Sequence, residues 1–386
     1  MIAAETATYP LSQPRPGWTE QDPELWINGA RQAVAGALAR APAVEILCIG
    51  LSAQMHGLTP LGADHRVLPP AILWNDQRTA AECDEIRALV GRERLIQITG
   101  NDALTGFTAP KILWVKNHEP EIFHRVRHIL LPKDYVRLRL TGAHATDKAG
   151  AAGTILFDLK RRDWSPEVVS ALGIDPVWLP PTYEGPAVTG HVTREAAEAT
   201  GLRAGTPVVG GGGDQAAQAV GSGIVRPGII SVTSGTSGVV FAYADSYAPE
   251  PDGRLHVFCH AVPGKWHVMG VMLSAGGALQ WFRNSLCNEE RAKAAAEGRD
   301  AYEYITEAAA QVPIGSEGLL FLPYLTGERT PHKDPHAKGA FIGLSLRHNK
   351  AYMARAVLEG VAYGMRDSLD IMREMGVPIT CLLYTS

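Results

Sequence analysis

The spacing of apolar residues along the chain predicts helices that alternate with short strands. From Glu24 to Ala41, apolar positions recur at helical spacing, and Pro23 stands where a first helical turn tolerates proline. Val44 to Leu51 is an apolar run typical of a strand, and it ends in the polar loop of residues 52–57. From Arg78 to Leu140 the pattern is again helical.

Two further strands run into glycine-rich segments. Val208 and Val209 lead into the glycines and the aspartate of residues 210–214, and a strand from Gly228 to Thr233 leads into residues 234–238. Strands that alternate with helices, with glycine-rich turns at the strand ends, indicate an α/β architecture. Glycines and a proline loosen residues 221–228, so we expect one domain in residues 1–222 and a second in 223–386.

Composition and charge are those of a globular protein without a global electrostatic field. Hydrophobic residues make up 46% and charged residues 20%, and the net charge is −4. An anionic ligand must therefore be held locally, and we expect neither a nucleic-acid nor a membrane partner. The 5 cysteines form no CxxC pair and their number is odd, which indicates a reducing compartment. With no signal-like or membrane-spanning apolar stretch in the sequence, we predict a cytoplasmic protein.

The chemistry-bearing candidates stand in the glycine-rich segments. Neither a P-loop pattern nor a GxGxxG pattern occurs, so a nucleotide would have to bind in another way. Glycines let backbone N–H groups approach an anion, which makes both segments candidates for phosphate binding. Asp214 follows four glycines and is a candidate for catalysis; the alternative is an aspartate that caps the next helix.

Several segments resemble motifs of the FGGY carbohydrate kinases, and they occur in the family's order over residues 1 to about 380. The segments similar to the two family signatures, the catalytic aspartate turn, the ATP-phosphate loop and a nucleotide-contacting segment are Gly106–Asn117, Gly327–Gly343, Gly213–Gln215, Gly235–Ser237 and Gly276–Trp281. Within the family, Gln54–Gly57 and Trp74–Asp76 resemble xylulokinases more than glycerol kinases.

This resemblance implies an actin-like, ribonuclease-H-like ATPase fold with two α/β domains around a cleft. It implies the phosphorylation of D-xylulose to D-xylulose 5-phosphate, with ATP and Mg²⁺ as cofactors. It also implies a homodimer, because members of the family are often dimers.

The resemblance assigns roles to individual residues. Asp214 is expected to be the general base that accepts the proton of the sugar hydroxyl. The residues expected to bind the sugar are Met55, His56, Trp74, Asp76 and Gln215. The residues expected to bind the nucleotide are Gly235, Thr236, Ser237, Gly276 and Gln280.

Structural alternatives stay open for three of these residues. His56 can be a loop histidine bonded to the backbone, Trp74 a core residue, and Gln280 a solvent-facing helix residue. No metal ligand is expected, because the histidines and the cysteine of residues 256–260 lack a second ligand cluster. Lys111, in the first signature, is expected to fix the fold rather than take part in chemistry.

The two ends of the chain are expected to depart from the family. The sequence starts downstream of the hairpin that carries the family's Asp-x-Gly-Thr-Ser phosphate loop, and Cys381–Ser386 do not resemble the family. The alternatives to a D-xylulose kinase are a kinase for ribulose, gluconate or glycerol, and an inactive truncated fragment. A structural actin-like protein is disfavoured, because Asp214 would then have no purpose.

Overall fold

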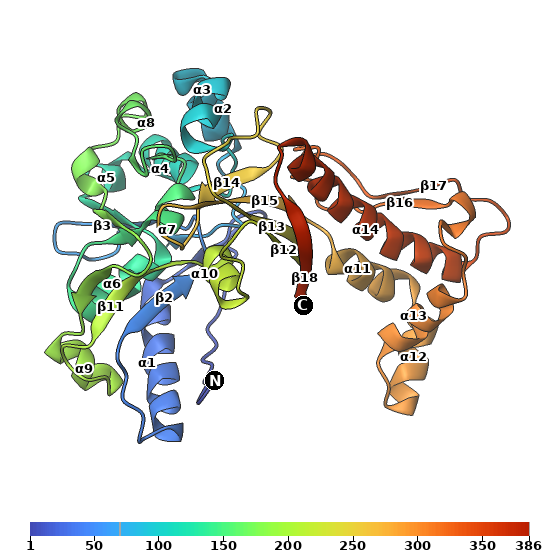
Figure 1. Cartoon of the computed structure of the whole chain (residues 1–386), viewed down its shortest axis with the longest axis horizontal. Helices are drawn as coiled ribbons and strands as arrows, with labels where there is room; N and C mark the ends of the chain where they lie inside the picture. The colour runs from blue at the N-terminus through green and yellow to red at the C-terminus, as the bar shows by residue number, and fades with distance from the viewer. Residues whose placement is uncertain (69–70, 386) are drawn as a thin grey trace. The chain divides into compact units, whose positions relative to one another are not determined.

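The computed structural model describes residues 1–68 and 71–385, and it divides into two compact units (Figure 1). Unit 1 comprises residues 1–223, 245–253 and 257–267, and unit 2 comprises residues 224–244, 254–256 and the chain from 268 onward. The chain thus leaves unit 1 after residue 223 and returns to it twice, in residues 245–253 and 257–267. The domain division expected at residues 222 and 223 stays a prediction.

The elements up to residue 223 belong to unit 1. Its strands are β1 (Glu20–Gln21), β2 (Ile49–Ala53), β3 (Thr59–Leu61), β4 (Ala71–Ile72), β5 (His128–Leu130), β6 (Thr146–Asp147), β7 (Phe157–Asp158), β8 (Asp163–Trp164), β9 (Thr182–Tyr183), β10 (Val188–His191) and β11 (Pro207–Gly213). Its helices are α1 (Pro23–Arg40), α2 (Ala80–Val90), α3 (Arg92–Thr99), α4 (Thr108–His118), α5 (Pro120–Phe123), α6 (Pro132–Thr141), α7 (Lys148–Ala152), α8 (Pro166–Ala171), the 3-10 helix η1 (Pro176–Trp178), α9 (Arg194–Thr200) and α10 (Asp214–Gly221).

The later elements are mostly those of unit 2. The strands are β12 (Gly228–Ser234), β13 (Gly238–Ala244), β14 (His256–Cys259), β15 (Trp266–Met272), β16 (Leu320–Leu322), β17 (Ala340–Ile342) and β18 (Ile379–Thr385). The helices are α11 (Gly276–Leu286), α12 (Asn288–Glu297), α13 (Ala301–Ala310), the 3-10 helix η2 (Ser316–Gly318) and α14 (Lys350–Glu374). No helix in the described part of the chain is long and apolar enough to cross a membrane.

A three-stranded sheet in the order β10-β11-β2 positions the functional side chains of unit 1. Strands β11 and β2 are parallel, so their carboxyl ends lie at the same edge. Helix α1 begins as the sequence predicts: Pro23 opens it, and the Asp22 carboxylate accepts the N–H of Glu24 at 3.0 Å. Strand β2 starts at Ile49, later than the apolar run that begins at Val44.

The glycine run of residues 210–213 is strand, and the expectation of a turn there is wrong. The register with β2 shifts between Val209 and Gly212, which marks a bulge. Gly211 has a φ of +71°, and a Cβ there would lie 2.0 Å from the Leu51 carbonyl oxygen. The glycines therefore allow close backbone approach within the sheet.

A fully buried arginine holds this bulged strand in place. Arg137, on α6, donates from Nη1 to the Val209 carbonyl at 2.7 Å and from Nη2 to the Gly210 carbonyl at 2.6 Å. Its Nε lies 3.6 Å from a carboxylate oxygen of Asp134, which is also buried. The bonds satisfy carbonyl groups at the bulge and fix the end of β11.

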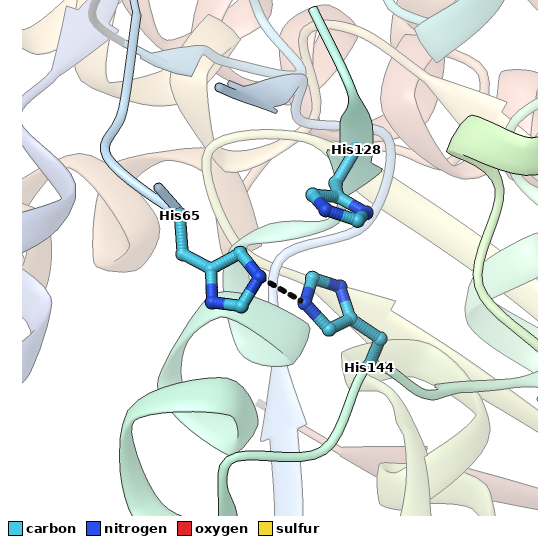
Figure 2. A group of neighbouring side chains, drawn as sticks. All are labelled: His65, His128 and His144. Atoms are coloured by element: carbon cyan, nitrogen blue, oxygen red, sulfur yellow. Dashed lines mark hydrogen bonds between the residues drawn. The ribbon is translucent and has the colours of Figure 1, made fainter. Parts of the chain in front are cut away.

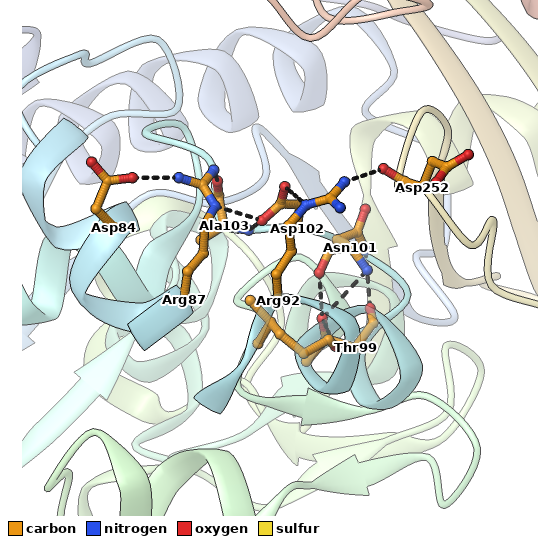
Figure 3. Close-up of polar contacts among 9 residues, drawn as sticks. Asp84, Arg87, Arg92, Thr99, Asn101, Asp102, Ala103 and Asp252 are labelled. Carbon is orange, nitrogen blue, oxygen red and sulfur yellow. Dashed lines mark hydrogen bonds and ion pairs between the residues drawn. The ribbon is translucent and has the colours of Figure 1, made fainter. Parts of the chain in front are cut away.

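Two hydrogen bonds tie the returning segments to the rest of unit 1 (Figure 3). Arg92 pairs with Asp102 at 3.0 Å and donates from Nη2 to the Asp252 carbonyl at 2.6 Å. Asn101 donates from Nδ2 to the Val257 carbonyl at 2.8 Å. The segment that begins at Val257 is thereby anchored beside α3.

Strands β3 and β5 form a small antiparallel pair in which Leu61 faces His128. The turn that follows β3 carries His65, and His144 lies just before β6. The imidazole rings of these three histidines gather in one place (Figure 2).

The largest sheet has five strands in the order β14-β15-β13-β12-β18. A tight hairpin joins β12 to β13, and β18 pairs in parallel with β12. The core of unit 2 lies between α11, α13 and α14, around the buried Phe282, Phe321 and Val357. Residues 381–385, for which we expected no family-like structure, lie in β18, and Ser386 lies outside the described residues.

Candidate functional site

Three of the residues expected to bind or activate a sugar follow adjacent strand ends in unit 1. In the parallel pair, Gly213 at the end of β11 lies opposite Ala53 at the end of β2. Asp214 directly follows the first strand, and Met55 and His56 come soon after the second. The carboxyl ends of parallel strands are where open α/β sheets bind ligands.

Met55 packs directly on the glycine before Asp214. A Cβ placed on Gly213 would lie 2.6 Å from Cγ of Met55, and one placed on Gly153 would lie 2.9 Å from its Cε. Met55 itself is buried. The contact sets the spacing between the loop after β2 and the start of α10.

His56 is held in a defined orientation. Its backbone has a φ of +69°, and its ring Nδ1 lies 2.6 Å from the Gly153 carbonyl oxygen. The ring stands edge-on to Phe107 at a centroid distance of 4.9 Å and lies 5.7 Å from Phe258. The alternative for His56, a loop histidine bonded to the backbone, therefore describes its Nδ1 atom. The aromatic rings fix the plane of the imidazole.

Lys111 positions the backbone of His56, a structural role of the kind expected for it, although its partner was not predicted. The lysine is fully buried, and its Nζ donates to the carbonyl oxygens of His56 at 2.9 Å and Gly106 at 2.6 Å. Thr108 donates to the same His56 carbonyl at 3.1 Å. The lysine has a fixed place in the first family signature, which indicates that it has a role. Its partner, His56, lies 55 positions away in the sequence, so the signature could not identify it.

Asp214 is the first residue of α10, and the N-cap position belongs to Gly213. Its Oδ1 accepts the N–H of Gln215 at 2.9 Å. Partial removal from water raises the pKa of Asp214, while the hydrogen bond from Gln215 acts in the opposite direction. A raised pKa makes the carboxylate a better proton acceptor than an ordinary aspartate.

Asp76 and Trp74 lie in the loop after β4 but in different surroundings. The buried carboxylate of Asp76 accepts the N–H of Thr19 at 2.6 Å and Nη2 of Arg78 at 2.7 Å, which makes it an anchor of this loop. Trp74 is 43% exposed, so the alternative that it belongs to the core is wrong. Sugar contacts by either residue stay predictions.

In unit 2 the structure brings together the two segments expected to bind nucleotide. The three-residue hairpin loop of residues 235–237 docks on the start of α11: the N–H of Gly276 donates to the Gly235 carbonyl at 2.8 Å, and the N–H of Gly277 donates to the Thr236 carbonyl at 3.0 Å. A Cβ on Gly276 would lie 2.5 Å from the Gly235 carbonyl oxygen, so this position needs glycine.

This docking uses N–H groups at the start of α11. A phosphate at the loop would therefore meet the loop's own backbone and hydroxyl groups rather than the helix terminus. Thr236 is exposed and Ser237 is half-buried. Gln280 is exposed on α11, which agrees with the alternative of a solvent-facing helix residue. Nucleotide binding by Thr236, Ser237 and Gln280 stays a prediction.

Glu328 in the second signature is a buried carboxyl group that supports the segment before α11. Its Oε1 accepts the N–H of Leu273 at 2.9 Å and that of Arg329 at 2.8 Å. Burial raises the pKa of Glu328 to about 7, although the two N–H groups that it accepts act in the opposite direction.

Comparison with protein families and curated proteins gives consistent matches. The N-terminal domain of the FGGY family of carbohydrate kinases matches residues 1–221, and its C-terminal domain matches residues 230–385. Xylulose kinase of Escherichia coli is 44% identical over 377 residues, which are 98% of this chain and 75% of that protein. Gluconokinase of Bacillus subtilis is 31% identical and covers 100% of this chain and 75% of its own length.

A solved structure of a xyloylose kinase from Brucella ovis superimposes with a TM-score of 0.89 at 42% identity, covering 97% of this chain and 75% of that one. The expected actin-like α/β fold of two domains is thereby confirmed. Because the second family domain matches as far as residue 385, the expectation that the chain departs from the family after Thr380 is wrong. Together these matches establish that the chain belongs to the FGGY family of carbohydrate kinases, the sugar-phosphorylating enzymes that its motifs resemble.

Proposed function

We propose that this carbohydrate kinase phosphorylates D-xylulose to D-xylulose 5-phosphate with ATP. The observation that carries the proposal is the pair of adjacent strand ends: β2 leads to Met55 and His56, and β11 leads to Asp214. The similarity to xylulose kinase of Escherichia coli, at 44% identity, supports this sugar over others.

In the proposed reaction, ATP supplies the γ-phosphoryl group. Asp214 orients a sugar hydroxyl and accepts its proton while the new bond between oxygen and phosphorus forms and ADP leaves. The raised pKa of Asp214 suits this role, because the carboxylate gains affinity for the proton it must receive. His56 and Gln215 hold other hydroxyl groups of the sugar, and Met55 and Trp74 line its carbon skeleton.

The phosphates of ATP are proposed to bind at the loop of residues 235–237 in unit 2. A Cβ on Gly235 would have only one neighbour within 4 Å, the Ser237 carbonyl oxygen at 3.8 Å, so the loop leaves room at its tip. The hydroxyl groups of Thr236 and Ser237 are donors suited to phosphate oxygens. Among the described residues no cluster of three carboxylates suited to Mg²⁺ is found, so we propose that Mg²⁺ binds chiefly to the phosphates.

The proposal is tested by a coupled assay for ADP with purified chain and a panel of D-xylulose, L-ribulose, D-gluconate and glycerol. We expect kcat/KM for D-xylulose to exceed the others by at least about 10-fold, because a site built to bond particular hydroxyl groups rejects sugars that place them elsewhere. Preference for D-gluconate would favour the reaction named for the Bacillus subtilis relative. Binding of D-xylulose without turnover would support the alternative of an inactive fragment.

The same preparation tests the expected homodimer. Sedimentation equilibrium would give a mass of twice 41.4 kDa for a dimer. A single-chain mass would contradict that expectation without affecting the proposed reaction.

A further inference from the structure

Three histidines from separate parts of unit 1 form a compact cluster (Figure 2). Nε2 of His65 and Nε2 of His144 lie 3.2 Å apart, and a nitrogen of His128 lies with both of them within 4.8 Å. The ring centroids are 4.1 to 5.2 Å apart. The proposed kinase reaction assigns no role to any of these residues.

The backbone around the cluster is well defined. The N–H of His65 donates to the Gly62 carbonyl at 3.1 Å, and the N–H of Gly62 donates to the Arg66 carbonyl at 3.0 Å, which closes the turn after β3. His65 has a φ of +61°, a conformation that a non-glycine residue adopts only when its surroundings favour it. His128 begins β5, which pairs with β3.

His144 reaches the cluster from the segment between α6 and β6. Helix α6 ends at Thr141, and the following Gly142 has a φ of +72°. The N–H of Ala143 donates to Oγ1 of Thr141 at 3.1 Å. Three elements far apart in the sequence therefore present their imidazole rings to one another. Packing alone does not require three histidines here. Apolar rings would fill the same space and would have no polar atoms that need hydrogen-bond partners.

We propose that His65, His128 and His144 bind one divalent transition-metal ion, and that zinc is the ion that fits best. Imidazole nitrogens bind zinc at about 2.0–2.1 Å, which places two ligands of a tetrahedral site about 3.3 Å apart. The distance of 3.2 Å between His65 and His144 matches this spacing. The His128 nitrogen lies within 4.8 Å of both, so the His128 side chain has to move closer to complete the site. The ion replaces the hydrogen bond between the two Nε2 atoms, with both rings then protonated on Nδ1.

A route for the ion and for a fourth ligand exists beside His65. This residue is exposed, and it forms part of the wall of a cavity of about 620 Å³. The charged residues that line this cavity are the carboxylates of Asp22, Glu24, Asp64 and Glu195 and the guanidinium groups of Arg66 and Arg139. The excess of carboxylates attracts cations, and water from the cavity can complete a tetrahedral site. The bound ion would clamp the turn after β3 to β5 and to the segment before β6.

The proposal is tested with untagged, metal-free chain titrated with Zn²⁺ by calorimetry and with Co²⁺ by visible absorption. We expect one ion per chain, an increase of the melting temperature with Zn²⁺, and Co²⁺ bands without a thiolate charge-transfer band. The absence of a thiolate charge-transfer band would exclude the exposed thiols of Cys48 and Cys381 as ligands.

Variants locate the site. His144→Gln should weaken Zn²⁺ binding by more than about 100-fold. Loss of a group that only orients a metal ligand lowers the affinity by about 10- to 100-fold, so a larger effect indicates a direct ligand. His65→Gln should do the same, and because this side chain is exposed, the variant does not depend on repacking a core. The control is His191→Gln, which removes an exposed histidine from β10 of the same unit and should leave binding unchanged. Zn²⁺ binding that is absent from the unaltered chain, or equal in His65→Gln and the control, would overturn the proposal.

Discussion

The buried carboxyl group of Glu328 should make the stability of the protein depend on pH. Its pKa is raised from 4.5 to about 7 by burial, so between these values the folded protein keeps a proton that the unfolded chain has released. Stability therefore falls as the pH rises through this window, and the loss is complete above pH 7. A difference of 2.5 pKa units corresponds to about 3 kcal/mol, at 1.36 kcal/mol for each unit.

Glu328→Gln removes this titration and keeps an oxygen that accepts the N–H groups of Leu273 and Arg329. We expect the variant to be more stable than the unaltered protein by about 3 kcal/mol at pH 8, and the advantage to shrink as the pH falls towards 4.5. The measurement is the free energy of unfolding in urea at several pH values between 4.5 and 8. Glu289→Gln is the control, because that side chain is 92% exposed. An advantage that stays constant with pH, or that grows towards acid, would refute the reasoning.

Three further predictions concern the proposed sugar site of unit 1. Asp214→Asn should lower kcat by at least about 100-fold through loss of the general base while D-xylulose binding changes far less; near-normal turnover would exclude that role. His56→Ala should weaken sugar binding by about 1–3 kcal/mol in calorimetry, and an equal loss of ATP affinity would instead indicate unfolding. Gly213→Ala should destabilise the protein by about 1–3 kcal/mol in thermal or urea unfolding, because the new Cβ would stand 2.6 Å from Cγ of Met55. Gly221→Ala, where a Cβ meets nothing within 4 Å, is its control and should leave stability nearly unchanged.

Local patterns in the sequence predicted the elements whose causes are local. Helix α1 follows from a proline and an apolar face within 18 residues, and β12 follows from a short apolar run that begins at Gly228. The family motifs placed Asp214 beside a strand end, and the parallel register of β2 and β11 explains why Met55 packs on Gly213, the residue before Asp214. These features depend on contacts between residues close in sequence or on a recognised order of motifs.

Features that depend on distant partners could not be predicted in this way. Nothing in the sequence around Lys111 points to the carbonyl of His56, and the three clustered histidines are separated by 63 and 16 positions. The glycines before Asp214 were mistaken for a turn because glycine serves turns and close backbone approach equally well. Only the neighbouring strand distinguishes the two uses, because its Leu51 carbonyl oxygen would lie 2.0 Å from a Cβ on Gly211.

The bulged glycine strand also determines where the enzyme's substrate range can be altered by engineering. Side chains introduced at Gly210, Gly211 or Gly213 would collide with backbone carbonyl groups or with Met55 before they reached any ligand, so randomising these codons would yield mainly misfolded clones. Trp74 is 43% exposed in a loop after β4, so we expect a change of side-chain size there to meet no such collision. A compact library for new sugar acceptors should therefore keep the glycines fixed and vary Trp74 and Gln215, two of the residues that we propose bind the sugar.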